Sequence, residues 1–378
     1  MSTILKGMTW NHPRGYDPMV ACSRLWQEKT GVAVTWEKRS LQDFETYPVE
    51  ELAQAFDLIV IDHPHVGQIT HEGCLQPLDV AGREAERTAL LDGSVGASYP
   101  SYTWQGRQWA FPIDAATQVQ AFRPDLLATA PSRWSEVLEL AHQGRVLIPM
   151  RSPHSMMTFY TLCANLGSPC RSDGRGTLID DATGIRAFDM IRDLVGLVDP
   201  DCFEIDPIAV LEKMADNGSE IACSPLIYGY VSYSIAGFRP RAVQFTDIAA
   251  AGSLGPAGTA LGGTGIAVSA FSKSIPQAID FAYWIASGAV QKGHYAEAGG
   301  QPGHAQAWED EIVNAATHDF YRGTRKTLET AWVRPRHDGY MAFQSQGSEV
   351  INDGLKSGTA SETVVSELNR LFLTSFGM

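Results

Sequence analysis

The 378-residue sequence has few positive charges and no long hydrophobic run. Its 29 lysine and arginine residues are outnumbered by 43 aspartate and glutamate residues, and the net charge of −14 opposes binding to a phosphate backbone. No apolar stretch approaches the roughly 18 residues of a membrane-spanning helix. We therefore predict no nucleic-acid partner and no direct insertion into a membrane.

A secretion signal is also missing from the first residues. Residues 1–10 lack the basic start, apolar stretch and small-residue cleavage site of a signal peptide. Two interpretations stay open, namely a secreted protein whose signal has been removed and a protein that stays in the cytoplasm.

Six dispersed cysteines form no Cys-x-x-Cys motif and no zinc-like pairing with histidine, so we predict no metal and no cofactor. Buried free thiols are the expected state, because cysteine is commonly buried. A disulfide between Cys163 and Cys170, across a turn at 167–169, is the alternative and would suit an oxidising compartment.

Catalytic motifs are absent as well. The sequence contains no Gly-x-Ser-x-Gly, no His-Glu-x-x-His and no phosphate-binding loop of the P-loop type, so we predict that the chain is not an enzyme. An acid/base set of Asp62, His63, Asp114 and His154 is the rival interpretation, since these groups are suited to proton transfer if the fold brings them together.

The composition and the hydrophobic pattern indicate two α/β domains. Hydrophobic residues make up 44% and charged residues 19%, which is typical of globular proteins, and the length exceeds that of one ordinary domain. The first third alternates strand-like and helix-like segments. The segments are a strand at 4–10, a helix at 18–29, a strand at 32–36, a helix at 48–55 and a strand at 57–61.

Ligands bind beyond the carboxyl ends of the strands in such open sheets, which directs attention to 11–16, 37–40 and 62–65. The long extended segment 109–122 is expected to leave the first domain, and the glycine-rich segment 249–264 is expected to return to it or to border a cleft.

Several motifs occur in a characteristic order over nearly the whole chain. They are Asp57-Leu-Ile-Val-Ile61, Gly73-Cys-Leu-Gln-Pro-Leu-Asp79, Gly106-Arg-Gln-Trp-Ala-Phe-Pro112, Phe122-Arg-Pro-Asp-Leu-Leu127 and Gly262-Gly-Thr-Gly-Ile-Ala-Val-Ser269. Together they resemble the family 1 extracellular solute-binding proteins of ABC importers, the group that contains maltose-binding protein.

This resemblance implies a type II-like periplasmic-binding-protein fold with two lobes, crossing segments as a hinge and a ligand cleft between the lobes. The expected lobes are residues 1–115 plus 265–308 and residues 116–264 plus 309–378. The implied function is capture of a small polar solute by hinge closure and delivery to the membrane permease of an ABC importer, by a monomer in the periplasm. A cytoplasmic solute-sensing protein is the alternative, beside an enzyme derived from this fold.

In the first lobe the candidate ligand-binding residues follow strand ends or the Phe-Pro crossing. They are Trp10, Asn11, His12, Arg14, Arg39, Asp62, His63, His65 and Asp114. Trp10 suits stacking on a sugar ring or packing in the core. The two histidines that flank Pro64 do not form a tetrahedral metal set by themselves, so hydrogen bonding to solute or local structure is the expected role.

In the second lobe the candidates lie at a helix start, in an aromatic segment, in the glycine-rich crossing and near the end of the chain. They are His154, Ser155, Tyr228, Tyr230, Gly263, Thr264 and Arg334, with Tyr340 as a further candidate. Several of the candidates in both lobes are basic, although the chain is acidic. The sequence therefore favours an anionic solute, because carboxylates and phosphates accept paired hydrogen bonds from arginine.

Overall fold

The computed structural model describes residues 3–41 and 49–377. The chain divides into two compact units, each built from two separate segments. Unit 1 comprises Met1–Ala116 and Gly262–Ala315, and unit 2 comprises Thr117–Leu261 and Ala316–Met378. The predicted α/β fold class is confirmed, since both units combine a sheet with helices.

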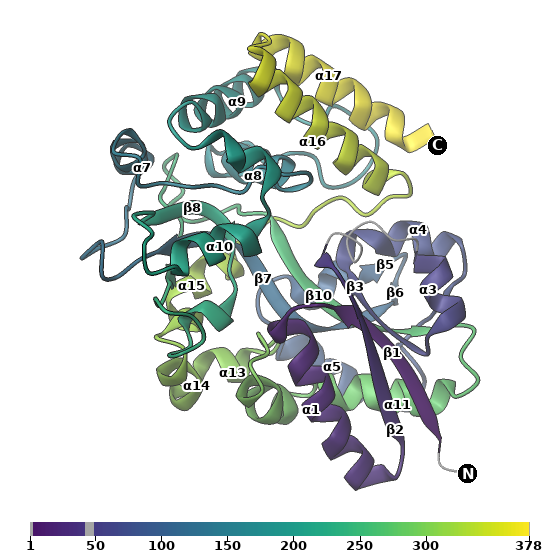
Figure 1. Cartoon of the computed structure of the whole chain (residues 1–378). Coiled ribbons are helices and arrows are strands. Elements are labelled where there is room, and N and C mark those ends of the chain that lie inside the picture. Colours follow the sequence, from purple (N-terminus) through teal and green to yellow (C-terminus); the bar gives the residue numbers. More distant parts are fainter. Residues whose placement is uncertain (1–2, 42–48, 378) are drawn as a thin grey trace. The chain divides into compact units, whose positions relative to one another are not determined.

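Unit 1 is built on a twisted sheet in which strands follow the order β2, β1, β3, β10 (Figure 1). The strands are β1 (Ile4–Trp10), β2 (Ala33–Arg39), β3 (Leu58–Asp62), and β10 (Leu261–Ser269), with β4 (Leu75–Gln76) paired to β10. β1 runs parallel to β2 and β3, whereas β10 runs antiparallel to β3. The sheet thus brings the ends of β1 and β3 to the same edge, as expected for parallel strands.

Aromatic side chains fix the helices of unit 1 on this sheet. Trp26 of α1 (Pro13–Thr30) packs edge-on against Phe281 of α11 (Ile275–Ala286), with ring centroids 5.7 Å apart. Trp36 of β2 lies 6.3 Å from the same phenylalanine ring. Large aromatic groups stabilise such a core because each removes a large apolar area from water.

The other α-helices in the described part of unit 1 are short. They are α3 (Val49–Ala55), α4 (Val66–His71), α5 (Glu84–Asp92), α6 (Ser98–Ser101), α12 (Gly288–Val290), α13 (Ala305–Glu309) and α14 (Glu311–Ala316). A two-stranded hairpin of β5 (Thr103–Trp104) and β6 (Arg107–Gln108) precedes β7 (Ala110–Phe122), whose first half belongs to unit 1.

Unit 2 contains the second half of β7, which pairs antiparallel with β8 (Cys223–Tyr228) and with β9 (Gln244–Thr246). Seven α-helices accompany these strands in the described part of unit 2. They are α7 (Trp134–His142), α8 (His154–Asn165), α9 (Asp181–Val195), α10 (Pro207–Ala215), α15 (Phe320–Glu329), α16 (Tyr340–Ser357) and α17 (Ser361–Thr374). All twelve residues of α8 are buried, so this helix lies in the centre of the unit.

The start of the first helix differs from the start predicted from the hydrophobic pattern. α1 begins at Pro13 rather than at 18, because His12 caps it and proline is well tolerated in the first turn.

Two further structural differences concern unit 2. The apolar pattern of segment 145–150 predicts a strand, but the segment forms only an isolated bridge between Val146 and Cys223. α16 is not apparent from local pattern, since it contains two interior glycines. One of them, Gly354, is required by packing because a Cβ atom there would collide with Val364 of α17.

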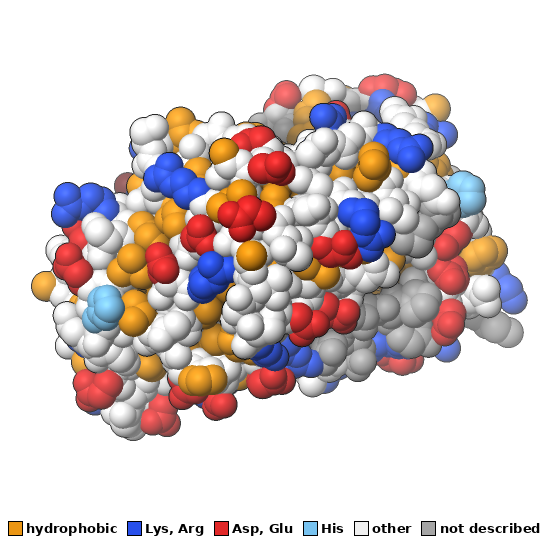
Figure 2. Space-filling view, turned by 90° about the horizontal axis from the view of Figure 1, so that it is seen from above, with side chains coloured by type: hydrophobic (Ala, Val, Ile, Leu, Met, Phe, Trp, Pro, Cys, Tyr) orange, Lys and Arg blue, Asp and Glu red, His pale blue; other side chains and the backbone are white. Residues whose placement is uncertain are grey.

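No helix in the described ranges is both long and apolar enough to cross a membrane. On the face shown in Figure 2, acidic and basic side chains are interspersed with polar and apolar ones. All six cysteines are buried and unbridged, in agreement with the expected free thiols.

Gly7 of β1 provides a test of the unit 1 core. Its register partner is Trp36, and a Cβ atom at position 7 would overlap three carbon atoms of the tryptophan ring. We expect Gly7→Ala to lower the free energy of unfolding by about 1–3 kcal/mol, the usual cost of overpacking. Urea denaturation measures this change.

Gly218→Ala serves as the matched control because Gly218 is exposed in a turn, and we expect a change within about 0.5 kcal/mol. Equal stability of the two variants would contradict the predicted packing around Trp36.

Candidate functional site

A buried ion pair between Arg14 and Asp114 organises the candidate residues of unit 1. Arg14 lies in the first turn of α1 and Asp114 lies on β7, and their side chains are 4% and 0% exposed. Arg14 donates from Nε to Asp114 Oδ2 over 2.7 Å, and its second terminal nitrogen donates to Oδ1. This two-point geometry is the strong form of the arginine–carboxylate interaction.

Burial raises the pKa of Asp114, and the nearby Asp62 carboxylate acts in the same direction, whereas Arg14 opposes both effects. The backbone of Asp114 is fixed separately, through a bridge to Pro302 and through Gln301, which exchanges hydrogen bonds with Ala115. The carboxylate is therefore held in one position by its partner and by its strand.

The loop between β1 and α1 places three candidates next to this pair. His12 accepts a hydrogen bond at Nδ1 from the backbone of Arg14, over 3.1 Å, and so caps α1. The Trp10 ring lies over Gly15, where a Cβ atom would collide with it, and Trp10 is part of the buried core. Asn11 is exposed, and its backbone donates to the carbonyl of the partly exposed Arg39.

Asp62, His63 and His65 follow β3 in a short 3-10 turn. His63 is fully buried and meets Tyr102 edge-on, with ring centroids 6.2 Å apart, whereas Asp62 is partly exposed. The Tyr102 hydroxyl donates to the carbonyl of Ile61. In the described ranges no group of three His, Cys, Asp or Glu residues is arranged to hold a metal ion.

Gly263 and Thr264, expected in the second lobe, lie in unit 1 at the start of β10. Thr264 is in register with Asp62, and its buried hydroxyl has no hydrogen-bond partner among the described residues. Gly263 has a φ of 87°, and a Cβ atom there would collide with the backbone of Asp114. Glycine is therefore required for this close approach.

Unit 2 gathers a second group of candidates around the start of α8. His154 is 3% exposed and lies edge-on to the partly exposed Tyr228, with ring centroids 6.2 Å apart. Arg334 is 4% exposed and donates to the carbonyl of Leu261 and to Oε1 of Gln344. The Tyr340 hydroxyl donates to the same Gln344 oxygen over 3.0 Å.

Two candidates in unit 2 are buried in the protein interior. The Ser155 hydroxyl is fully buried and bonds the hydroxyl of Ser348 over 2.5 Å, which joins α8 to α16. Tyr230 is 5% exposed and precedes a 3-10 turn over Val231–Ser234.

Sequence reasoning missed Tyr102, Gln344 and Arg151 as members of these groups. Tyr102 precedes the short hairpin that leads to β7, and Gln344 belongs to the unrecognised α16. Arg151 lies three residues before His154, and its proximity to the helix start was the available signal.

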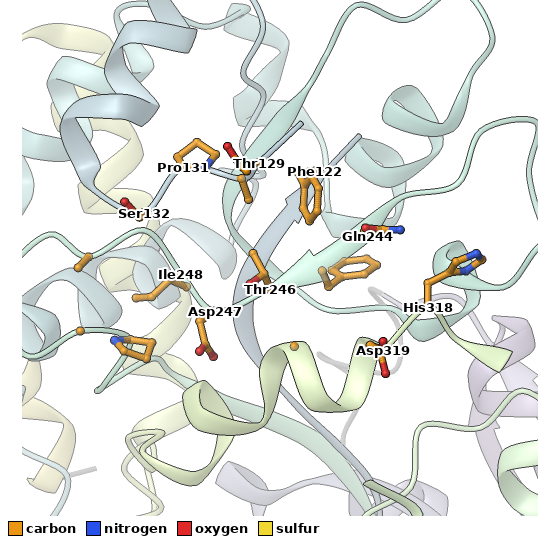
Figure 3. Close-up of a pocket in the computed structure, with 16 residues that line it drawn as sticks. Phe122, Thr129, Pro131, Ser132, Gln244, Thr246, Asp247, Ile248, His318 and Asp319 are labelled. Atoms are coloured by element: carbon orange, nitrogen blue, oxygen red, sulfur yellow. The ribbon is translucent and has the colours of Figure 1, made fainter. Parts of the chain in front are cut away.

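A separate surface pocket of about 660 Å³ lies in unit 2, between β9, the loop after β7 and the start of α15 (Figure 3). Phe122, Ile248 and Pro131 supply apolar surface, and Asp247 accepts two hydrogen bonds from Thr327. None of the sequence-predicted candidates lines this pocket.

The family model of the bacterial extracellular solute-binding proteins matches residues 26–318 of the chain. The comparison with curated proteins returned no match. Solved structures with the same fold include three whose ligands are named.

The ribitol complex of an ABC transporter solute-binding protein from Agrobacterium radiobacter K84 is 19% identical, with 98% of each chain covered and a TM-score of 0.82. Maltose-bound MalE3 of T. maritima is 16% identical, with 98% of this chain and 99% of that chain covered and a TM-score of 0.84. An α-D-tagatose-bound solute-binding protein of Thermotoga lettingae TMO is 16% identical, with both chains fully covered and a TM-score of 0.83.

We expect Asp114→Asn to lower the free energy of unfolding by about 3–5 kcal/mol, because the buried charge of Arg14 loses its counter-charge. The double variant Arg14→Met/Asp114→Leu should recover most of this loss, since it leaves no buried charge behind. Urea denaturation of the three proteins checks the expectation. A loss below about 1 kcal/mol in the single variant would contradict the role of the pair.

His154 gives a pH-dependent prediction. Burial lowers the pKa of His154 from 6.5 to about 3, with Arg334 and Arg151 acting in the same direction. The unfolded chain therefore binds a proton that the folded protein excludes, so the contribution of this group is complete above pH 6.5 and is lost as the pH falls toward 3.

Between pH 6 and 4.5 the wild-type free energy of unfolding should fall relative to that of His154→Gln by about 1.4 kcal/mol per pH unit. Denaturant titrations at half-unit intervals measure the two slopes. His142→Gln, at the exposed end of α7, is the control and should follow the wild type. Parallel slopes for wild type and His154→Gln would show that His154 is not buried as the neutral ring.

Proposed function

The chain belongs to the bacterial extracellular solute-binding proteins, and from this premise we propose that it captures a small polar solute and delivers it to the permease of an ABC importer. Members of this family act by binding rather than by chemical conversion, so we propose no catalytic step. The proposal places the protein in the periplasm, as a monomer that closes on its solute by hinge motion.

The organisation of unit 1 is the observation that carries this proposal. Four segments that are far apart in sequence bring polar side chains to one edge of the sheet, where the carboxyl ends of β1 and β3 lie. The contributing groups include Asp62, Thr264 and the Arg14–Asp114 pair. Ligand sites of open α/β sheets occupy this position.

The chemistry of these groups suits a polyhydroxyl solute. The partly exposed Asp62 carboxylate accepts hydrogen bonds from hydroxyl groups, and the Thr264 hydroxyl both donates and accepts. The neighbouring proteins of similar fold hold ribitol, maltose and α-D-tagatose, which are all rich in hydroxyl groups. We therefore propose a sugar, a polyol or one of their acids as the solute class.

A thermal-shift screen of sugars, polyols and sugar acids tests the binding role. A ligand that binds only the folded state should raise the stability by about 2.7 kcal/mol when present at about 100 times its dissociation constant. We expect at least one member of the screen to raise the melting temperature in a concentration-dependent way.

Asp62→Asn should weaken the binding of that compound by about tenfold, because the variant loses a charged hydrogen-bond acceptor. Isothermal titration calorimetry measures the effect. Asp92→Asn, at the exposed end of α5, is the control and should bind with unchanged affinity. Unchanged binding by Asp62→Asn would remove this residue from the proposed site.

A further inference from the structure

We propose that the surface pocket of unit 2 binds a second small molecule, a primary amine with an apolar body, whose ammonium group bonds the carboxylate of Asp247. All the residues that line this pocket belong to unit 2, and none of them is a candidate for the solute site. The proposal therefore goes beyond the proposed function and does not rest on it.

The size and the lining of the pocket suit a small organic molecule. Its volume of about 660 Å³ falls within the range of about 300–1,000 Å³ that is usual for ligand pockets. Phe122, Pro131 and Ile248 contribute apolar surface from three separate segments (Figure 3). Polar groups, among them Gln244 and Asp247, interrupt this surface. Apolar walls with a few polar groups are typical of sites that bind and orient small molecules.

Buried amide side chains hold two walls of the pocket in place. Gln120 is fully buried and donates to the carbonyl of Pro131 over 2.8 Å. Asn165, also fully buried, donates to the carbonyls of Gly255 and Ala257 over 2.7 and 2.9 Å. Pro131 and Gly255 both line the pocket, so these walls are preformed and a ligand loses little affinity to ordering of the chain.

The start of α15 forms a third wall. Gly323 allows the helix to approach β9 closely, because a Cβ atom there would lie 2.8 Å from the carbonyl oxygen of Phe245. His318 and Asp319, just before the helix, have φ angles of 50° and 57°, which histidine and aspartate adopt more often than most residues do. The ring of His318 donates from Nδ1 to the carbonyl of Ser234 over 2.6 Å. This wall is therefore held by close packing and by a hydrogen bond.

The charge of the lining favours a cation. Asp247 and Asp319 line the pocket, whereas no lysine or arginine does. Asp319 pairs with Arg322 over 3.3 Å, but the groups that donate to Asp247 belong to the neutral Thr327. The net charge of −14 adds a long-range attraction for positively charged molecules.

Asp247 is oriented through one of its two oxygens. Oδ1 accepts hydrogen bonds from the backbone and the hydroxyl of Thr327, over 3.0 and 2.5 Å, and no donor in the described part of the chain bonds Oδ2. An ammonium group carries three donors and a full positive charge, so it can bond this oxygen by a charge-assisted hydrogen bond. The apolar body of the same molecule would contact Phe122 and Ile248.

Amines and alcohols with the same carbon skeleton test the proposal by NMR titration at pH 7.5, where the amines are protonated. The pairs are phenethylamine with 2-phenylethanol, cyclohexylmethylamine with cyclohexylmethanol, and butylamine with 1-butanol. We expect at least one amine to bind about five or more times tighter than its alcohol. Sodium chloride at about 0.5 M should weaken the binding of that amine by about threefold or more, because salt screens the attraction between charges.

Asp247→Asn should lower the affinity for the amine by about fivefold or more and change the affinity for the alcohol by less than about twofold. Asparagine keeps an oxygen that can accept from Thr327, so we expect the fold to be retained. Asp206→Asn is the matched control, since Asp206 is also half-buried in unit 2, accepts from the backbone of Ala209 and does not line the pocket. Circular dichroism confirms that each variant is folded.

Asp62→Asn separates this pocket from the proposed solute site, and it should bind the amine as the wild type does. Weakened amine binding by Asp62→Asn would overturn the proposal, as would undiminished binding by a folded Asp247→Asn variant. If Asp247→Asn does not fold, the wild type decides, because no preference for any amine over its alcohol, or no effect of salt, would also overturn it. Amine binding by a protein that binds no sugar, polyol or sugar acid would support the proposal while the proposed function fails.

Discussion

The buried pair of Arg14 and Asp114 is the interaction on which the candidate site of unit 1 depends. It joins the first turn of α1 to β7 across 100 residues of sequence. Two buried charges are tolerated only when each satisfies the other, so the pair fixes both elements together. His12, which caps α1 through the backbone of Arg14, and Gly263, which packs against the backbone of Asp114, take their positions from this arrangement.

His154 of unit 2 is buried as a neutral ring. Burial lowers its pKa to about 3, and Arg334 and Arg151 act in the same direction. The carbonyl of Leu261 and Oε1 of Gln344 accept hydrogen bonds from Arg334. The stability of unit 2 therefore depends on pH through His154, because the unfolded chain can bind a proton that the folded ring excludes.

The sequence predicts much of the fold, because the order of the motifs and the periodicity of hydrophobic residues depend on the local backbone conformation. The extended segment expected at 109–122 matches β7 closely, and the strand expected at 4–10 matches β1. Packing contacts between distant segments give no such local signal. α16 contains interior glycines, which lower its helix propensity, and Gly354 is needed there because a Cβ atom would collide with Val364 of α17. Segment 145–150 is apolar and so resembles a strand, but it forms only one bridge.

The sequence by itself determined the family, the α/β class and the segments that carry polar side chains at strand and helix ends. Only the tertiary structure decided how each of these side chains is buried, charged and hydrogen-bonded. It paired Arg14 with Asp114, engaged Ser155 in helix packing and buried His154 as a neutral ring. The physical reason is that charge and hydrogen bonding depend on distance and burial, and both are set by residues that lie far away in the chain.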